Sequence, residues 1–179
     1  MKRYIALLRG INVSGKNKIS MSELKKGFEE LDFSEVMTYL NSGNVVFSSS
    51  GEDKNMLLHK IKSMIKDRFD LEIPVFIVLQ EKLKELLSNA PDWWGDDSKE
   101  IYDNIIFLLP PLSYQELYDE LGVPKAEYEK VHHYENVVFW SFSRKDYQKT
   151  HWWAKTANAE VSDKITIRTA NTVRKIVRL

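Results

Sequence analysis

The stretch Asn44-Val45-Val46-Phe47 recurs later in the chain as Asn136-Val137-Val138-Phe139. Ahead of each copy lie an apolar run typical of a buried strand, a segment with helical periodicity and a second strand-like run. Because this order recurs together with the motif, the sequence predicts a duplicated chain built from two similar modules that face each other. The cleft between them is where we expect a site.

Each module has the element order β-α-β-β-α-β of a ferredoxin-like half-open sandwich. The first is expected over residues 1–90, with strands at 4–8, 35–40, 45–48 and 73–79, and helices beginning after Ser20 or Ser22 and at 53–69. The second is expected over residues 91–179, with strands at 101–109, 130–134, 137–142 and 165–169, and helices at 114–121, 145–157 and 172–178. A short helix at 81–88 and a linker at 89–97 precede it. The predicted fold class is α+β, a tandem duplication with an extra C-terminal helix.

The composition is that of a globular protein, with 43% hydrophobic and 29% charged residues among 179. The chain has no cysteine, which excludes disulfides, thiolate metal sites and cysteine nucleophiles and suits a reducing compartment. Arg9 interrupts the N-terminal apolar run, so we do not interpret it as a signal peptide. No apolar stretch is long enough to cross a bilayer. We therefore expect a cytoplasmic protein with no membrane partner.

The formal net charge is zero, which argues against broad nucleic-acid binding, yet the charges are unevenly distributed. Both ends are basic and free of acids over residues 1–22 and 164–179. The basic residues there are Lys2, Arg3, Arg9, Lys16 and Lys18, and Lys164, Arg168, Arg174, Lys175 and Arg178. We expect Arg9, Lys16, Arg168 and Lys175 to contribute to one positive surface at the module interface.

Several motifs favour plain structural interpretations. Residues 10–16 match the phosphate-loop pattern G-x-x-x-x-G-K, but Asn17 follows where a Ser or Thr would bind magnesium, so we interpret the segment as a connection. His132 and His133 are neighbours on a strand and point to opposite faces, which argues against a shared metal site with His151. Each pair of tryptophans is interpreted as one core anchor with one neighbour at the rim, rather than as base-stacking residues. The acids of the linker region could ligate a divalent cation, but we interpret them as solvated charges. They are Asp92, Asp96, Asp97, Glu100 and Asp103.

The segment from Thr166 to Lys175 runs from a strand directly into a helix. Exposed backbone donors at such a junction attract anions, and Arg168 and Lys175 would strengthen the attraction. The alternative is that Thr169 or Asn171 only caps the helix while the cations stay solvated. Both interpretations stay open at this point.

Four blocks resemble a known family: ALLRGINV at 6–13, GKNK at 15–18, TYLNSGNVVF at 38–47 and TANTVRK at 169–175. Together they are similar to the bacterial domain-of-unknown-function family 1697. The resemblance implies a tandem ferredoxin-like α+β architecture and brings no established activity. Members usually carry Arg-Asn-Trp-Asn-Thr at the last block, where Ala170 replaces the tryptophan, so we expect no stacking residue at that position.

The polar signature of these blocks lies at turns, which is typical of a shared surface or of asparagines that brace the turns. If the signature residues converge, they form a donor-rich site for phosphate or carboxylate. The candidate ligand-binding residues are Arg9, Asn12, Lys16, Asn44, Arg168, Asn171 and Lys175.

No general base, nucleophile, metal or cofactor accompanies this set, so binding is favoured over catalysis. The leading hypothesis is a non-hydrolytic binding module for an anionic ligand, a nucleotide or single-stranded nucleic acid. One alternative is an enzyme of small phosphorylated metabolites, which a carboxylate or histidine beside the basic cluster would favour. Another is a structural or partner-binding protein. The sequence gives no indication of oligomeric state.

Overall fold

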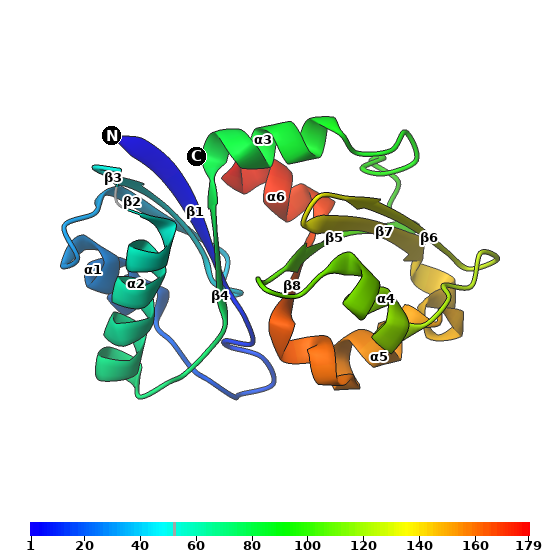
Figure 1. Ribbon diagram of the computed structural model, residues 1–179, viewed down its shortest axis with the longest axis horizontal. Coiled ribbons are helices and arrows are strands. Elements are labelled where there is room, and N and C mark those ends of the chain that lie inside the picture. Colours follow the sequence, from blue (N-terminus) through cyan, green and yellow to red (C-terminus); the bar gives the residue numbers. More distant parts are fainter. Residues whose placement is uncertain (52) are drawn as a thin grey trace. The chain divides into compact units, whose positions relative to one another are not determined.

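The computed structural model describes residues 1–51 and 53–179 and has a mixed α+β fold with two four-stranded antiparallel sheets (Figure 1). The chain divides into unit 1, which comprises Met1–Lys84 and Ile176–Leu179, and unit 2, which comprises Glu85–Lys175. The division therefore falls inside the helix that precedes the predicted linker, and the last four residues group with unit 1. Over the described residues, no helix has the length and apolar character needed to cross a membrane.

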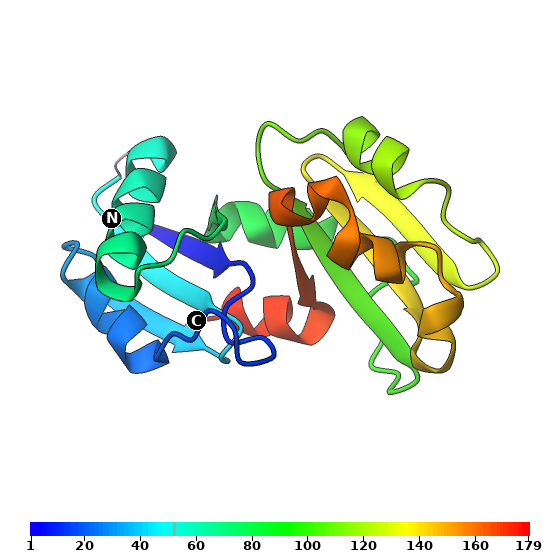
Figure 2. The same cartoon turned by 90° about the horizontal axis from the view of Figure 1, so that it is seen from below.

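Unit 1 follows the predicted element order, and its sheet has the strand order β2-β3-β1-β4. Its elements are β1 Lys2–Leu8, α1 Met21–Glu29, β2 Ser34–Tyr39, β3 Asn44–Ser49, α2 Lys54–Phe69 and β4 Val75–Leu79, followed by α3 Gln80–Ser88. Ser20 caps α1 by accepting from Glu23 N, and Asp53 caps α2 by accepting from Asn55 N. Both helices lie against one face of the sheet (Figure 2).

The core under these helices is aromatic. Phe47 on β3 stacks on Phe33 at a centroid distance of 4.6 Å and on Tyr4 at 5.6 Å, and Phe28 of α1 meets it edge-on at 5.3 Å. Such pairs add to the burial of apolar area. This cluster fixes the register of the strands that carry the first loop and the first hairpin.

Unit 2 repeats the arrangement with the strand order β6-β7-β5-β8. Its elements are β5 Ile101–Leu108, α4 Tyr114–Leu121, β6 Glu129–Tyr134, β7 Val137–Ser143, the 3₁₀ helix Arg144–Lys149, α5 Trp152–Asn158, the 3₁₀ helix Glu160–Lys164, β8 Ile165–Thr169 and α6 Ala170–Ile176. Trp140 and Trp152 fill its core, while Trp153 is 40% exposed. The second tryptophan pair therefore consists of one core residue and one surface residue, as predicted.

The single helix predicted at 145–157 is wrong. The segment forms two short helices that are separated at Thr150, and the extended backbone of Thr150 ends the first helix. The Thr150 hydroxyl donates to Tyr147 O at 2.6 Å and accepts from Trp153 N at 3.3 Å, so the same side chain begins the second helix. Local side-chain bonds of this kind compete with a continuous helix.

The Val-Val-Phe part of the repeated motif lies on corresponding strands of the two sheets, β3 and β7, but its register differs, and Asn136 lies in the turn before β7 whereas Asn44 begins β3. In unit 1, Val45 and Phe47 pack in the core under the helices. In unit 2, the residues in the corresponding core are Val138 and Trp140. Because side chains alternate between the faces of a strand, the second copy is displaced by one residue relative to the first.

Candidate functional site

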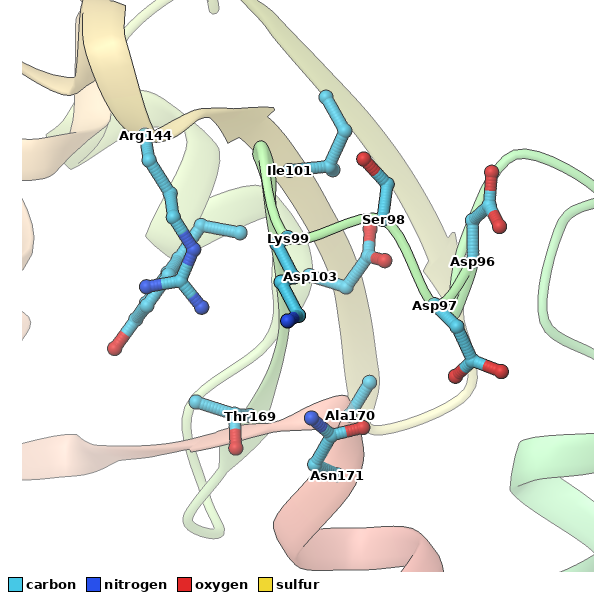
Figure 3. Close-up of a pocket in the computed structure, with 11 residues that line it drawn as sticks. Asp96, Asp97, Ser98, Lys99, Ile101, Asp103, Arg144, Thr169, Ala170 and Asn171 are labelled. Carbon is cyan, nitrogen blue, oxygen red and sulfur yellow. The ribbon is translucent and has the colours of Figure 1, made fainter.

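A polar pocket of about 340 Å³ opens in unit 2, where β5 begins and β8 passes into α6 (Figure 3). Its lining residues are Asp96, Asp97, Ser98, Lys99, Ile101, Tyr102, Asp103, Arg144, Thr169, Ala170 and Asn171. The pocket exists because β5 extends beyond the end of β8. Asn104 is paired with Thr169, whereas residues 101–103 are paired with β7 on their other side.

The backbone of β5 contributes to this pocket. Leu108 N donates to Asn136 O on the β7 side, and Leu109 N donates to Lys164 O on the β8 side. Since bonding directions alternate along an antiparallel strand, the N–H and C=O groups of Ile101 and Asp103 are directed away from β7. They point toward the side where β8 has ended.

Two cations reach into the pocket. Within the described part of the chain, neither Lys99 nor Arg144 makes an ion pair, and Figure 3 shows both side chains extending toward Thr169 and Asn171. The Arg144 guanidinium lies over the Tyr102 ring, 4.4 Å from its centroid. This cation-π contact orients Arg144 and leaves the donors at the rim of its planar group for an anion.

The carboxylates of the pocket differ in their surroundings. Asp97 forms an ion pair with Arg174 at 3.5 Å. Asp103 is 8% exposed and accepts a hydrogen bond from the Ser141 hydroxyl. Asp96 is exposed. The pocket therefore offers acceptors for hydroxyl or amino groups beside its two cations.

Of the predicted ligand-binding residues, Asn171 lines the pocket. The Thr169 hydroxyl is engaged at the start of α6: its Oγ1 accepts from Thr172 N at 3.3 Å and shares a hydrogen bond with Thr172 Oγ1 at 3.0 Å. Thr169 rather than Asn171 is thus the capping residue, and the exposed Asn171 amide stays at the pocket. The cap expected in one of the two interpretations is therefore present, and anion binding at this junction stays a prediction.

The other two predicted residues of this segment do not line the pocket. Arg168 is 8% exposed, and its Nη1 donates to Thr166 Oγ1 at 2.8 Å and to Ile167 O at 2.9 Å. Those bonds make it a brace of β8. Lys175 is exposed on α6.

In unit 1, the predicted asparagines form hydrogen bonds within turns. Asn12 Nδ2 donates to Ile19 O and Asn41 O at 3.0 and 2.9 Å, and its Oδ1 accepts from Ile19 N at 2.9 Å. Asn44 is fully buried, and its Nδ2 donates to Tyr39 O at 2.8 Å and Ser42 Oγ at 3.1 Å. Both therefore brace the first loop and the first hairpin.

The first loop closes on its own polar groups. Asn12 N donates to Asn17 O at 3.1 Å, and Asn17 Nδ2 donates to Gly10 O at 3.0 Å. Arg9 is half-buried, and Lys16 is exposed, with its backbone N donating to Val13 O. The loop has the geometry of a braced connection. The predicted convergence of all seven residues on one surface stays a prediction.

A second pocket, of about 300 Å³, lies in unit 1 beside the first loop. Its described lining comprises Asn12, Gly15, Lys18, Ile19, Ser20, Met21 and Asn41, among which Lys18 alone is charged. The Asn12 amide is already engaged. The unit 2 pocket also contains three aspartates, of which Asp97 is paired with Arg174. We rank the unit 1 pocket below it because a single lysine offers no second charged donor to hold a phosphate.

The histidines have partners other than a metal. His133 stacks on Tyr114 at 4.1 Å, and His151 Nδ1 lies 2.8 Å from Val123 O. Across residues 1–51 and 53–179, no group of three or more potential metal ligands is found.

Sequence reasoning missed the residues that make the unit 2 pocket chemically distinctive. Asp103 lies within the strand predicted at 101–109, but it is 8% exposed rather than a solvated charge, and its position inside an apolar run is the available signal. Arg144 is not among the residues that the sequence singles out, and no local pattern connects it with Lys99. The pairing of β5 with β7 brings Arg144 N to Glu100 O at 2.8 Å, next to Lys99.

Comparisons with known proteins agree with this architecture. A family model described as a protein of unknown function, DUF1697, matches residues 1–139. The conserved bacterial protein SP0830 from Streptococcus pneumoniae is similar in structure, with a TM-score of 0.86 and 29% identity over 99% of this chain and 97% of that chain. The search of curated proteins found no match.

Proposed function

Because the chain belongs to the DUF1697 family, which is described as a family of unknown function, we propose its function from the polar pocket of unit 2. The protein is a non-hydrolytic binding module for an anionic ligand, with nucleotides and single-stranded nucleic acid as the first candidates. One observation carries this proposal: Lys99 and Arg144 extend into the same pocket without ion-pair partners in the described chain. A cytoplasmic location stays a prediction from the sequence.

The pocket suits a phosphate that is attached to a polar body. A guanidinium oriented by stacking can donate two parallel hydrogen bonds to phosphate, and a lysine adds a point charge. Asn171 supplies an amide, and Asp96 and Asp103 accept from hydroxyl or amino groups. A nucleotide has all of these groups, which is why it comes first among the anions to test.

The test is calorimetric titration with inorganic phosphate, ribose 5-phosphate, nucleoside monophosphates and a short oligonucleotide at low salt. Arg144→Ala should weaken binding of the phosphorylated probes about tenfold, because a hydrogen bond to a charged group is lost. Lys145→Ala removes a cation from the same 3₁₀ helix outside the pocket lining and serves as the control. Binding should also weaken with salt. Equal affinities for Arg144→Ala and the unchanged protein would contradict the proposal.

A second candidate function is an enzyme that acts on a small phosphorylated metabolite. The buried carboxylate of Asp103 beside Lys99 and Arg144 favours it, since such a group can accept a proton from a substrate hydroxyl. Asp103→Asn separates the two functions. It should abolish turnover of a phosphorylated substrate followed by phosphorus NMR if the protein is an enzyme, and leave ligand affinity within a few-fold if it is a binding module.

We also propose that the two units derive from duplication of one ferredoxin-like module. The shared strand order of the two sheets supports this proposal. The displaced register of the repeated motif predicts which residues correspond: Phe47 with Trp140, rather than with Phe139. Superposition of the isolated units that instead aligned Phe47 with Phe139 would contradict this assignment.

A further inference from the structure

An aromatic recess of about 180 Å³ adjoins the polar pocket. Its lining residues are Tyr102, Phe142, Arg144, Tyr147 and Trp153. Tyr102 and Arg144 line both cavities, so the recess and the pocket are neighbours that share these two side chains. A ligand bound at Arg144 would have a polar cavity on one side and an aromatic one on the other.

The rings of the recess leave Trp153 available for stacking. Trp153 meets Tyr147, Phe142 and Tyr102 at interplanar angles of 76°, 71° and 83°, which are edge-to-face contacts rather than parallel stacks. Its side chain is 40% exposed although it is the largest apolar group of the recess. A planar group entering the recess would find an aromatic face that the described neighbours do not cover in parallel.

We propose that the recess holds the base of a mononucleotide whose phosphate lies in the polar pocket against Arg144 and Lys99. This inference rests on the proposed function and specifies its ligand. The recess is small enough for one ring system, whereas single-stranded nucleic acids use a series of stacking residues along a groove. The Asp103 carboxylate, which lies between Arg144 and Asp96 in Figure 3, is an acceptor for a ribose hydroxyl.

The test compares the four nucleoside monophosphates, ribose 5-phosphate and hexa-adenylate by calorimetry, with tryptophan fluorescence as a second signal. The preferred monophosphate should bind about tenfold more tightly than ribose 5-phosphate, because stacking of one base adds affinity. Trp153→Ala should remove that difference and leave ribose 5-phosphate binding unchanged. Trp153→Leu keeps an apolar side chain against Tyr147 and guards against loss of folding. Trp93→Ala, outside both cavities, is the matched control.

The outcomes separate this inference from the proposed function. Equal affinities for monophosphates and ribose 5-phosphate, or an equal loss of both in the Trp153 variants, would overturn the base-binding recess while leaving anion binding intact. A hexa-adenylate affinity about a hundredfold above that of AMP would overturn the assignment to a mononucleotide. If no phosphorylated probe binds and Arg144→Ala has no effect, the proposed function itself fails.

Discussion

The first hairpin of unit 1 and the polar pocket of unit 2 both carry the signature of the family, but they use their polar groups differently. Asn12 donates to Ile19 O in the first loop and to Asn41 O in the hairpin, and Asn44 donates to Tyr39 O and Ser42 Oγ of its own hairpin. Lys99 and Arg144 make no ion pair in the described chain, and Asn171 is exposed. Polar residues at turns therefore include both braces and ligand-binding candidates, and their hydrogen-bond partners tell the two apart.

The largest loss of stability is expected from a substitution at Gly43 in the unit 1 hairpin. Its φ is +85°, and a Cβ there would lie 2.8 Å from both Leu8 Cβ and Ile11 Cδ1. Gly43→Ala should lower the free energy of unfolding by about 3 kcal/mol, which combines left-handed backbone strain with overpacking. Urea denaturation measures this loss.

Gly10→Ala is the matched control for that variant. Gly10 also has a positive φ, of +67°, but nothing in the described chain lies within 4 Å of an added Cβ. Gly10→Ala should therefore lower the free energy of unfolding by about 1 kcal/mol, from backbone strain alone. Equal losses at Gly43 and Gly10 would show that the close packing of the hairpin against Leu8 and Ile11 contributes nothing.

The next largest loss of stability is expected from a substitution at Asn44, because its amide is fully buried. Asn44→Ala should lower the free energy of unfolding by about 2 kcal/mol, since Tyr39 O and Ser42 Oγ lose their donor. Asn158→Ala removes an exposed asparagine and should change stability by less than about 0.5 kcal/mol. Ligand affinity should not change in either variant. A loss of ligand affinity in Asn44→Ala without a loss of stability would assign the hairpin to the binding site.

Much of the fold follows from the sequence because hydrophobic periodicity specifies long elements well. Residues 114–121 and 165–169 form the predicted helix and strand, and the hairpins lie where expected. The register of the repeated motif could not be predicted, since a four-residue match does not reveal which face of a strand is buried. The helix predicted at 145–157 failed because a single side chain, Thr150, ends one helix and begins the next.

The candidate site was predicted only in part for a different reason. Asn171 lies in a recognisable block, whereas Lys99, Asp103 and Arg144 are brought together by the pairing of β5 with β7. Such a constellation depends on contacts between residues distant in sequence. No local pattern encodes it.

The buried carboxyl group of Glu129, which pairs across the sheet with Phe142 of the aromatic recess, leads to a prediction on the pH dependence of stability. It is 3% exposed, its Oε2 accepts from His151 N just before α5, and within the described chain its Oε1 is buried without a partner. Burial raises the pKa of Glu129 above its ordinary value of 4.5, against the opposing effect of the backbone donors of His151 and Trp152. The folded protein therefore binds this proton more tightly than the unfolded chain.

The sign of the effect follows from that difference. The stabilisation that protonated Glu129 contributes to the folded state is fully present below pH 4.5. It is lost as the pH rises through the raised pKa that Glu129 has in the folded protein. Glu129→Gln keeps the acceptor for His151 N and removes the charge, so its melting temperature should exceed that of the unchanged protein at neutral pH and the gain should shrink toward pH 4. Glu127→Gln, at an exposed position, should show no such trend. A lower melting temperature of Glu129→Gln at neutral pH would mean that the carboxylate is better satisfied than its environment indicates.

The smallest changes in stability are expected at the junction of β8 and α6. Variants there test most directly whether a polar residue braces the fold or binds the ligand. Thr169 Oγ1 accepts from Thr172 N, so Thr169→Ala should cost about 1 kcal/mol of stability through loss of the helix cap. Asn171→Ala should change stability by less than about 0.5 kcal/mol because the residue is exposed, yet weaken AMP binding about threefold through loss of one neutral hydrogen bond. Calorimetric titration and thermal melting of both variants measure the two quantities side by side. If Asn171→Ala instead lowered stability as Asn44→Ala does, the asparagines of both units would be braces, and anion recognition in the pocket would rest on Lys99 and Arg144.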